Sequence, residues 1–190
     1  MSYDPQKHHR RSIRLPDYDY SQPGAYFITI VTYQRDCLFG EIIDGEMHLS
    51  LMGQIAKENW CAIPEHFPHA ELGAYVVMPN HVHGIIIIHE NGLATNSSPA
   101  VGATHWVAPT TNGPKRGSIG AIIGSYKMSV TRRIQRELNT TGGLLGRRYW
   151  QRNYYEHIIR NEAEYHRIHA YIESNPANWD QDDEHRVKSN

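Results

Sequence analysis

The chain has 190 residues, 39% of them hydrophobic, with 19 lysine and arginine residues against 20 aspartate and glutamate residues. This length and apolar fraction fit one domain that folds around its own core without disulfides. Because the charges nearly cancel, the chain as a whole is not a basic nucleic-acid-binding tail. The segment 115–167 is an exception, since it holds eleven basic and four acidic residues, a local balance of +7.

The sequence contains no pattern typical of a secreted or membrane-spanning protein. Cys37 and Cys61 are too far apart for a Cys-x-x-Cys motif and too few for a disulfide scaffold. The longest run of aliphatic residues, Ile85–Ile88, is far shorter than the ~20 residues of a membrane span, and residues 1–14 lack the apolar stretch of a signal peptide. We therefore expect a cytoplasmic protein with reduced cysteines and no contact with a membrane.

Residues 1–24 form a polar, basic segment in which Arg10 and Arg11 precede Pro16 and Pro23. Prolines beside a charge cluster are typical of an extended segment rather than of a packed element. We expect this segment to be either a basic arm that contacts DNA through Arg10 and Arg11, or a solvated tail.

The rest of the chain is predicted to form one domain over residues 25–180, followed by a polar tail over 181–190. In chain order, the predicted elements are a strand over 26–33, a hairpin over 38–50, a helix over 51–63, strands over 72–78 and 81–89, a flexible surface loop over 91–117, a helix over 118–138, a short strand or extended stretch over 149–159, and a helix capped by Asn161 and closed by Asn175-Pro176. These predictions rest on hydrophobic periodicity, β-branched and aromatic runs, and capping and turn residues.

The order of these elements predicts the fold class. Strands and helices follow one another without any repeat of fixed period. Such an order is typical of an α+β protein. We expect a mostly antiparallel sheet with the helices packed on one of its faces.

His81 and His83 alternate with Val82 at the start of a predicted strand. Alternate side chains of a strand share one face, so both imidazoles should point the same way. Two neutral imidazoles at this spacing can share one divalent ion when a third ligand completes the site. The same spacing also fits two half-exposed strand histidines that bind no metal.

The last predicted helix carries a tyrosine and an asparagine that would suit the same site. Tyr171 and Asn175 are four residues apart, so they lie on one side of the helix, next to the apolar face formed by Ile168 and Ile172. An amide oxygen is a suitable third ligand for Mg²⁺ or Mn²⁺. Alternatively, Tyr171 is an ordinary tyrosine at the edge of the core and Asn175 an ordinary residue at a helix end.

A tyrosine beside a divalent ion favours phosphoryl-transfer chemistry. A phenol, with its pKa of about 10, is a poor nucleophile, but a metal that polarises the target phosphate compensates for this. A covalent phosphotyrosine would conserve the energy of the broken bond for a later joining step.

The basic segment has the composition of a nucleic-acid-binding surface. In it, arginines alternate with aromatic residues, which suits phosphate contacts combined with stacking on unpaired bases. The basic residues that we expect to contact DNA are Lys127, Arg132, Arg133, Arg136, Arg147, Arg148 and Arg152. The alternative is a solvated basic face above aromatic core residues.

Three segments, taken together and in this order, resemble the REP-associated tyrosine transposases, domesticated relatives of the single-tyrosine HUH transposases of small insertion sequences. They are Met78–Gly84 (MPNHVHG), Trp150–Asn161 (WQRNYYEHIIRN) and Tyr171–Pro176 (YIESNP). The resemblance spans about residues 20–180.

This resemblance implies a ferredoxin-like core and a metal-dependent endonuclease and strand transferase that acts on single-stranded DNA at hairpin repeats. By position, His81 and His83 match the metal-binding pair, Tyr171 matches the nucleophile, and Asn175 stands at the third metal ligand. Tyr171 would attack a DNA phosphate and form a 5′-phosphotyrosine link, with Mg²⁺ or Mn²⁺ as cofactor. Relatives work as monomers or as homodimers.

Two other functions remain open at this stage. The first is a DNA-hairpin-binding module of the same fold with little or no cleavage activity. A metal-dependent phosphoesterase that uses water instead of Tyr171 is the third hypothesis. The formation of a covalent protein–DNA adduct distinguishes the transposase-like enzyme from both.

Overall fold

The computed structural model describes residues 18–90, 114–138, 147–182 and 184–185. Its elements, in chain order, are β1 (Gly24–Val31), η1 (Tyr33–Arg35), β2 (Gly40–Ile43), β3 (Glu46–Leu49), α2 (Leu51–Cys61), α3 (Ile63–His66), β4 (Ala70–Val77), β5 (His81–Ile88), α4 (Ile119–Leu138), β6 (Tyr155–Ile159), α5 (Glu162–Ser174) and η4 (Pro176–Gln181). Within these residues, no helix is both long and apolar enough to cross a membrane.

Four strands form the central sheet in the order β4-β5-β1-β6, and every neighbouring pair is antiparallel. The central pair, β1 and β5, stays in register along its whole length, from Gly24 opposite Ile88 to Val31 opposite His81. A separate hairpin is made by β2 and β3. The antiparallel sheet and its helices confirm the α+β class that the sequence predicts.

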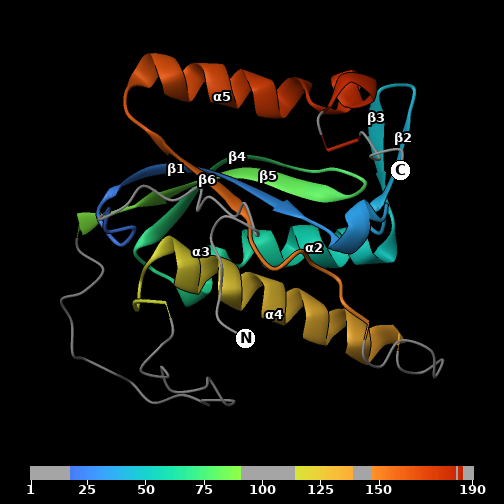
Figure 1. Cartoon of the computed structure of the whole chain (residues 1–190), viewed down its shortest axis with the longest axis horizontal. Helices are drawn as coiled ribbons and strands as arrows, with labels where there is room; N and C mark the ends of the chain where they lie inside the picture. Colours follow the sequence, from blue (N-terminus) through green and yellow to red (C-terminus); the bar gives the residue numbers. More distant parts are fainter. Residues whose placement is uncertain (1–17, 91–113, 139–146, 183, 186–190) are drawn as a thin grey trace, which may run out of the picture.

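Helices cover both faces of this sheet. Figure 1 shows α5 above the sheet, with α2, α3 and α4 below it. On β1, Tyr26 and Ile28 belong to the larger core shared with α2 and α4, whereas Phe27 packs with Ile168 and Ile172 of α5. The alternation of side chains along a strand explains this division.

The placement of α5 differs from the expected packing of all helices on one face. Strand β5 ends in four consecutive isoleucines, of which Ile86 and Ile88 face the larger core while Ile85 and Ile87 face α5. A strand that is apolar on both faces must be covered on both. This second apolar face of the sheet is what holds α5.

Most predicted elements are present, with bounds shifted by a few residues. The helix predicted over 51–63 ends at Cys61, and a further turn, α3, begins at Ile63 with Pro64 in its first turn, where the missing N–H costs nothing. In the 149–159 segment, only Tyr155–Ile159 is a strand. The predicted arm up to residue 17 and residues 91–113 of the predicted loop lie outside the described residues.

The turn of the β2–β3 hairpin confirms the signal that predicted it. Asp44 (φ 52°) and Gly45 (φ 79°) both adopt left-handed backbone conformations. Two left-handed residues between antiparallel strands form the turn whose twist matches the strands, and aspartate followed by glycine is a preferred pair there.

Gly84 allows the core to pack closely beneath the histidine pair. It follows His83 on β5 and faces the larger core, where a Cβ atom at this position would overlap the ring of Trp60. Trp60 belongs to α2 and is completely buried. The indole therefore lies directly against the backbone of β5, on the opposite side of the strand from His81 and His83.

Candidate active site

His81 and His83 project from β5 toward the sheet face that α5 covers, and both are buried. Their ring centroids are 4.3 Å apart. This places both imidazoles on one face, as the alternation of the strand predicts. They are not the half-exposed pair of the alternative interpretation.

Asn80 holds the ring of His81 in one orientation. The amide nitrogen of Asn80 donates to the carbonyl oxygens of Arg35 (3.3 Å) and Glu184 (3.0 Å). Its amide oxygen therefore faces His81 Nδ1 at 2.8 Å and accepts a hydrogen bond from it. With the proton on Nδ1, the lone pair of His81 lies on Nε2, which is the form that binds a metal.

His83 is held in the same way by the neighbouring strand. Thr29 lies directly opposite His83 in the β1–β5 register, and its hydroxyl is 2.9 Å from His83 Nδ1. The Nε2 atom of His83 is thus turned toward α5.

Burial keeps His81 neutral. The loss of solvent, and then the nearby His83 ring, lower the pKa of His81 well below its usual value. A neutral imidazole is the protonation state that can coordinate a cation.

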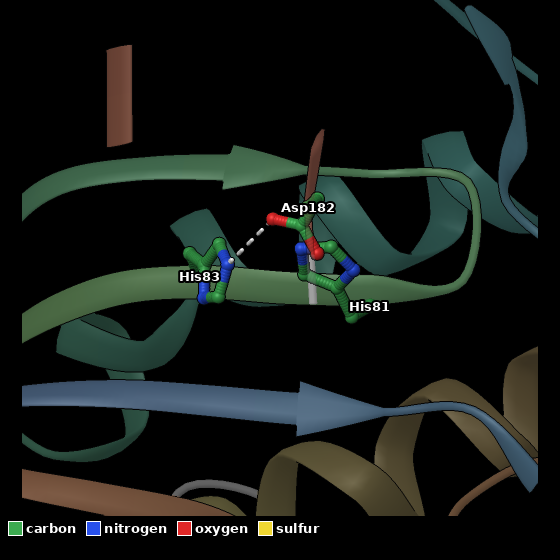
Figure 2. A group of neighbouring side chains, drawn as sticks. All are labelled: His81, His83 and Asp182. Atoms are coloured by element: carbon green, nitrogen blue, oxygen red, sulfur yellow. Dashed lines mark ion pairs between the residues drawn. The ribbon is translucent and has the colours of Figure 1, made fainter. Parts of the chain in front are cut away.

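Asp182 completes a group of three potential metal ligands. Its carboxylate lies against the two imidazoles (Figure 2), with Oδ2 4.0 Å from His83 Nε2. One ligand atom from each of His81, His83 and Asp182 lies within 4.8 Å of the others. Burial opposes ionisation of Asp182, but His83 and Asn175 beside it hold the pKa of this carboxyl well below its usual range.

Tyr171 reaches the same point from α5. Its hydroxyl oxygen lies 3.2 Å from His83 Nε2 and donates to Asp182 Oδ2 at 3.4 Å. Its ring packs edge-on against Phe27, with centroids 6.1 Å apart, and the residue remains 45% exposed. A side chain held at the border of the core in this way is fixed in position yet accessible to a large substrate.

Asn175 lies at the C-terminal end of α5 and is buried. Its amide nitrogen donates to Asp182 Oδ2 at 2.8 Å. Its amide oxygen and His81 Nε2 are both buried without a hydrogen-bond partner among the described residues. Buried polar atoms of this kind are rare in native proteins and call for an explanation.

These donors fit a divalent cation. Two imidazole nitrogens, a carboxylate and an amide oxygen form a mixed nitrogen and oxygen set that first-row divalent ions accept. A cation bound here would satisfy the lone pairs of His81 Nε2 and Asn175 Oδ1. The residues present therefore fit the metal that the sequence motifs imply.

The sequence motifs did not identify Asp182 as part of this group. It lies in the segment predicted as a polar tail, yet η4 turns the chain back so that Asp182 is 6% exposed. The Asp182 carboxylate also accepts a hydrogen bond from the backbone N–H of Glu184 at 2.7 Å. Nothing in the sequence of the acidic stretch around Asp182 distinguishes it from the other acidic residues there, so only the three-dimensional fold reveals it.

Among the arginines expected to contact DNA, two line a pocket at the end of β1. Arg148 and Arg152 border it together with Tyr33. The neighbouring Arg147 forms an ion pair with Asp36 at 2.9 Å. These arginines lie in the segment 147–152, which runs beside Tyr33 at the end of β1, where the N–H of Tyr33 donates to the carbonyl oxygen of Tyr149.

The basic residues of α4 are on the other side of the sheet from His81 and His83 (Figure 1). Arg132 and Arg136 are exposed there. Arg133 pairs with Glu58 and Glu137. These three arginines therefore do not line the histidine group.

Lys127, also on α4, has its amino group turned inward. It donates to the backbone oxygens of Gln151 and Asn153, each at 3.0 Å, and lies over the ring of Tyr154. Burial lowers the pKa of Lys127 to about 8. Its contacts hold the 151–153 segment in place.

The two arginines of the N-terminal segment that we expect to contact DNA, Arg10 and Arg11, lie outside the described residues.

Known proteins are similar to this chain in sequence or in fold. No family model matches the chain. An uncharacterized protein of Haemophilus influenzae (strain Rd) is 41% identical over 178 residues, which cover 92% of each chain. The structure of the REP-associated tyrosine transposase bound to a REP hairpin is 18% identical with a TM-score of 0.51, covering 87% of this chain and 74% of the other.

A candidate transposase from Deinococcus radiodurans R1 is also 18% identical, covering 84% of this chain and 95% of its own, with a TM-score of 0.45. The likeness to the hairpin-bound structure agrees with the fold that the sequence motifs imply. The chain thus belongs to one family with the Haemophilus influenzae protein, and its fold is that of the REP-associated tyrosine transposase.

Proposed function

We propose that this protein is a REP-associated tyrosine transposase that acts in the cytoplasm on single-stranded or hairpin DNA. It is a metal-dependent endonuclease and strand transferase that works through a 5′-phosphotyrosine intermediate. The observation that carries this proposal is the position of the Tyr171 hydroxyl, 3.2 Å from His83 Nε2 and beside the buried group of His81, His83 and Asp182. A solved protein of the same fold was bound to a REP hairpin, which supports DNA as the partner.

In this proposal, Tyr171 is the nucleophile. Its phenol oxygen attacks the phosphorus of a DNA phosphodiester, so a bond from Oη to phosphorus forms and the bond from phosphorus to O3′ breaks. The phenol proton leaves to a neighbouring acceptor, and the departing 3′ oxygen gains a proton to become a free hydroxyl. The DNA on the 5′-phosphate side stays attached to Tyr171, so a later attack by a 3′ hydroxyl can rejoin the strands.

His81, His83 and Asp182 would hold Mg²⁺ or Mn²⁺, with Asn175 contributing its amide oxygen. A divalent ion bound there would offset the negative charge that builds up on the phosphate oxygens during the attack. Thr29 and Asn80 orient the two imidazoles. Such outer contacts typically matter for metal affinity nearly as much as the ligands.

The proposed site is complete within one chain. Tyr171 of α5 meets His83 of β5 in the same chain, on the sheet face that α5 covers. A monomer therefore holds every proposed catalytic group, and a homodimer is not needed to bring the tyrosine to the histidines.

The test is the formation of a covalent adduct. The protein is incubated with a DNA hairpin that carries single-stranded flanks, in Mg²⁺ or Mn²⁺, and the product is resolved on a denaturing gel. We expect a slower-migrating protein–DNA band that is absent from Tyr171→Phe. Tyr155→Phe is the matched control, because Tyr155 is exposed and lies opposite Thr29 in the β1–β6 register, on the same sheet face.

Two results would support other functions. Tight hairpin binding without an adduct in either metal favours a DNA-hairpin-binding module with little or no cleavage activity. Cleavage that survives Tyr171→Phe favours a phosphoesterase that uses water as the nucleophile.

A further inference from the structure

Asp182 reaches the histidine group from an irregular segment rather than from a strand or a long helix. It follows η4, whose backbone departs from helical angles at Asn178. A side chain on such a segment keeps a fixed position only where other contacts restrain the backbone, because freedom left in the free protein must be lost on binding. The contacts that restrain this segment therefore affect how well Asp182 can act as a ligand.

One restraint is an ion pair between Arg35 of η1 and Glu184, two residues beyond Asp182. Nε and Nη2 of Arg35 both donate to Oε2 of Glu184, at 2.9 Å and 2.8 Å. The two side chains are only 27% and 23% exposed, so water and salt screen this pair less than a pair on the open surface. The pair joins segments that lie 149 positions apart in the chain.

Asn80 connects the same two residues through their backbones. Its buried amide nitrogen donates to the carbonyl oxygens of Arg35 and Glu184, and its amide oxygen accepts from His81 Nδ1. One side chain thus joins the turn that carries Arg35, the segment that carries Asp182 and one of the two histidines.

The turn that carries Arg35 has an unusual conformation. Gln34 (φ 56°) and Arg35 (φ 61°) both adopt left-handed backbone angles although neither is glycine. Such angles persist only where the surrounding structure holds them, and they cluster at functional sites. The N–H of Arg35 donates to the carbonyl oxygen of Thr32 at 3.2 Å, while Asn80 binds its carbonyl oxygen. The guanidinium of Arg35 therefore extends from a fixed base.

The ion pair acts on Asp182 through the adjoining backbone. The N–H of Glu184 donates to Oδ1 of Asp182 at 2.7 Å. The other carboxylate oxygen, Oδ2, lies 4.0 Å from His83 Nε2. One oxygen of Asp182 is thus held by the backbone of Glu184, and the other faces the histidines. Release of Glu184 from Arg35 would remove a restraint on the orientation of this carboxylate.

We propose that the ion pair between Arg35 and Glu184 is a clasp that positions Asp182 for a divalent ion, although neither side chain belongs to the ligand group. This inference rests on the proposed function and adds two positioning residues to it. The affinity of the site for the ion then depends on a contact made outside the site.

Charge alone predicts a different outcome for one of the two residues. The positive charge of Arg35 is near enough to act on His81, so it also repels a cation bound there. If the pair had no positioning role, removing the charge of Arg35 would strengthen binding of the ion. The clasp predicts the reverse, because Asp182 would lose its orientation.

The experiment measures the Kd for Mn²⁺ by isothermal titration. The variants are Arg35→Gln, Glu184→Gln and the double variant that carries both substitutions. Lys115→Gln is the matched control, because it breaks an exposed ion pair with Asp19 (2.6 Å) that lies ahead of α4 in the chain. Far-ultraviolet circular dichroism of each variant reports folding.

We expect Arg35→Gln and Glu184→Gln each to bind Mn²⁺ about 10-fold more weakly than the wild type, which is typical of a lost outer contact. The double variant should be no weaker than either single variant, since all three lack the same contact. If only charge mattered, the double variant would bind like the wild type, because its net charge is unchanged. Lys115→Gln should keep the wild-type Kd.

The proposal is overturned if Arg35→Gln binds Mn²⁺ as tightly as the wild type or more tightly, or if the double variant regains the wild-type Kd. Should Arg35→Gln fail to fold, a wild-type Kd in Glu184→Gln overturns it equally. When such a result accompanies a Tyr171-dependent adduct in the wild type, the clasp fails and the proposed function stands. A wild type that binds no Mn²⁺ overturns both.

Discussion

The hydroxyl of Tyr171 lies 3.2 Å from Nε2 of His83, although 88 positions separate the two residues in the chain. Tyr171 comes from α5 and His83 from β5. The ring of Phe27, on β1, packs against both of their rings. The apolar packing of α5 on this face therefore sets the distance between the proposed nucleophile and the proposed metal ligands.

Removing the charge of Asp182 should weaken metal binding. At a Mn²⁺ concentration about 100 times Kd, a bound ion stabilises the folded state by ~2.7 kcal/mol, which raises the Tm of a chain of this size by about 5–10 °C. We expect Asp182→Asn to lose most of this Mn²⁺-dependent rise, measured by scanning calorimetry. Asp180→Asn is the control, because Asp180 lies exposed in the same segment and should keep the full rise. An unchanged rise in Asp182→Asn would exclude Asp182 as a ligand.

The hydrogen bond between the Thr29 hydroxyl and Nδ1 of His83 should also affect metal affinity. Thr29→Val keeps the shape of the side chain but removes the hydroxyl that lies 2.9 Å from His83 Nδ1. Loss of such an outer contact typically lowers metal affinity by about 10–100-fold. Isothermal titration with Mn²⁺ should show this loss in Thr29→Val, while Thr29→Ser should retain most of the affinity. Equal Kd values for Thr29→Val and the wild type would show that the hydroxyl does not orient the imidazole.

A side chain at Gly84 should destabilise the fold. Since the new Cβ would overlap the ring of Trp60, Gly84→Ala forces the indole or β5 to move, at a cost of roughly 1–3 kcal/mol. Gly124→Ala is the matched control, because a Cβ atom at its position on α4 would meet nothing within 4 Å apart from its chain neighbours and the backbone of its own helix, and replacing a helical glycine should stabilise by roughly 0.5–1 kcal/mol. Urea unfolding measures both. Similar stabilities for the two variants would contradict the close packing of Trp60 against β5.

Glu164 should make the stability of α5 sensitive to acid. Its carboxylate accepts a hydrogen bond from the N–H of Arg160 (2.9 Å) and lies 2.8 Å from His157 Nε2, and these contacts, in that order, lower its pKa. A carboxyl whose pKa is lower in the folded state stabilises the fold above its unfolded pKa of 4.5. That contribution is lost as the pH falls from there through the folded pKa.

Glu164→Gln tests this dependence. In urea unfolding, the variant should be less stable than the wild type at pH 7, and the difference should shrink as the pH falls below about 4.5. A difference that is constant across this range would mean that the carboxylate charge of Glu164 does not contribute.

The local part of the site could be predicted from the sequence. The shared face of His81 and His83 follows from the period of a strand, and the shared side of Tyr171 and Asn175 follows from the period of a helix. Asn161 caps α5 as predicted, with its side chain accepting from the N–H of Glu164. Each of these predictions depends only on residues close together in the chain.

The remaining parts depend on contacts between distant segments. Asp182 joins the histidines because η4 reverses the chain, and no local pattern announces this return. Lys127 lies at the edge of the apolar stripe of α4. The helical periodicity does not predict that its amino group turns inward and donates to the carbonyl oxygens of Gln151 and Asn153. Nor can alternation along β5 decide which helix covers which face, because the strand is apolar on both.

The most direct test of the central claim is to identify the residue that carries the DNA. After reaction with a hairpin substrate in Mn²⁺, nuclease and trypsin digestion followed by mass spectrometry locates the attached nucleotide. We expect a 5′-nucleotide phosphate on the Tyr171 side chain, in the peptide that begins after Arg167, together with a free 3′ hydroxyl on the other DNA product. Attachment to a different residue, or cleaved DNA with no nucleotide bound to the protein, would contradict this account.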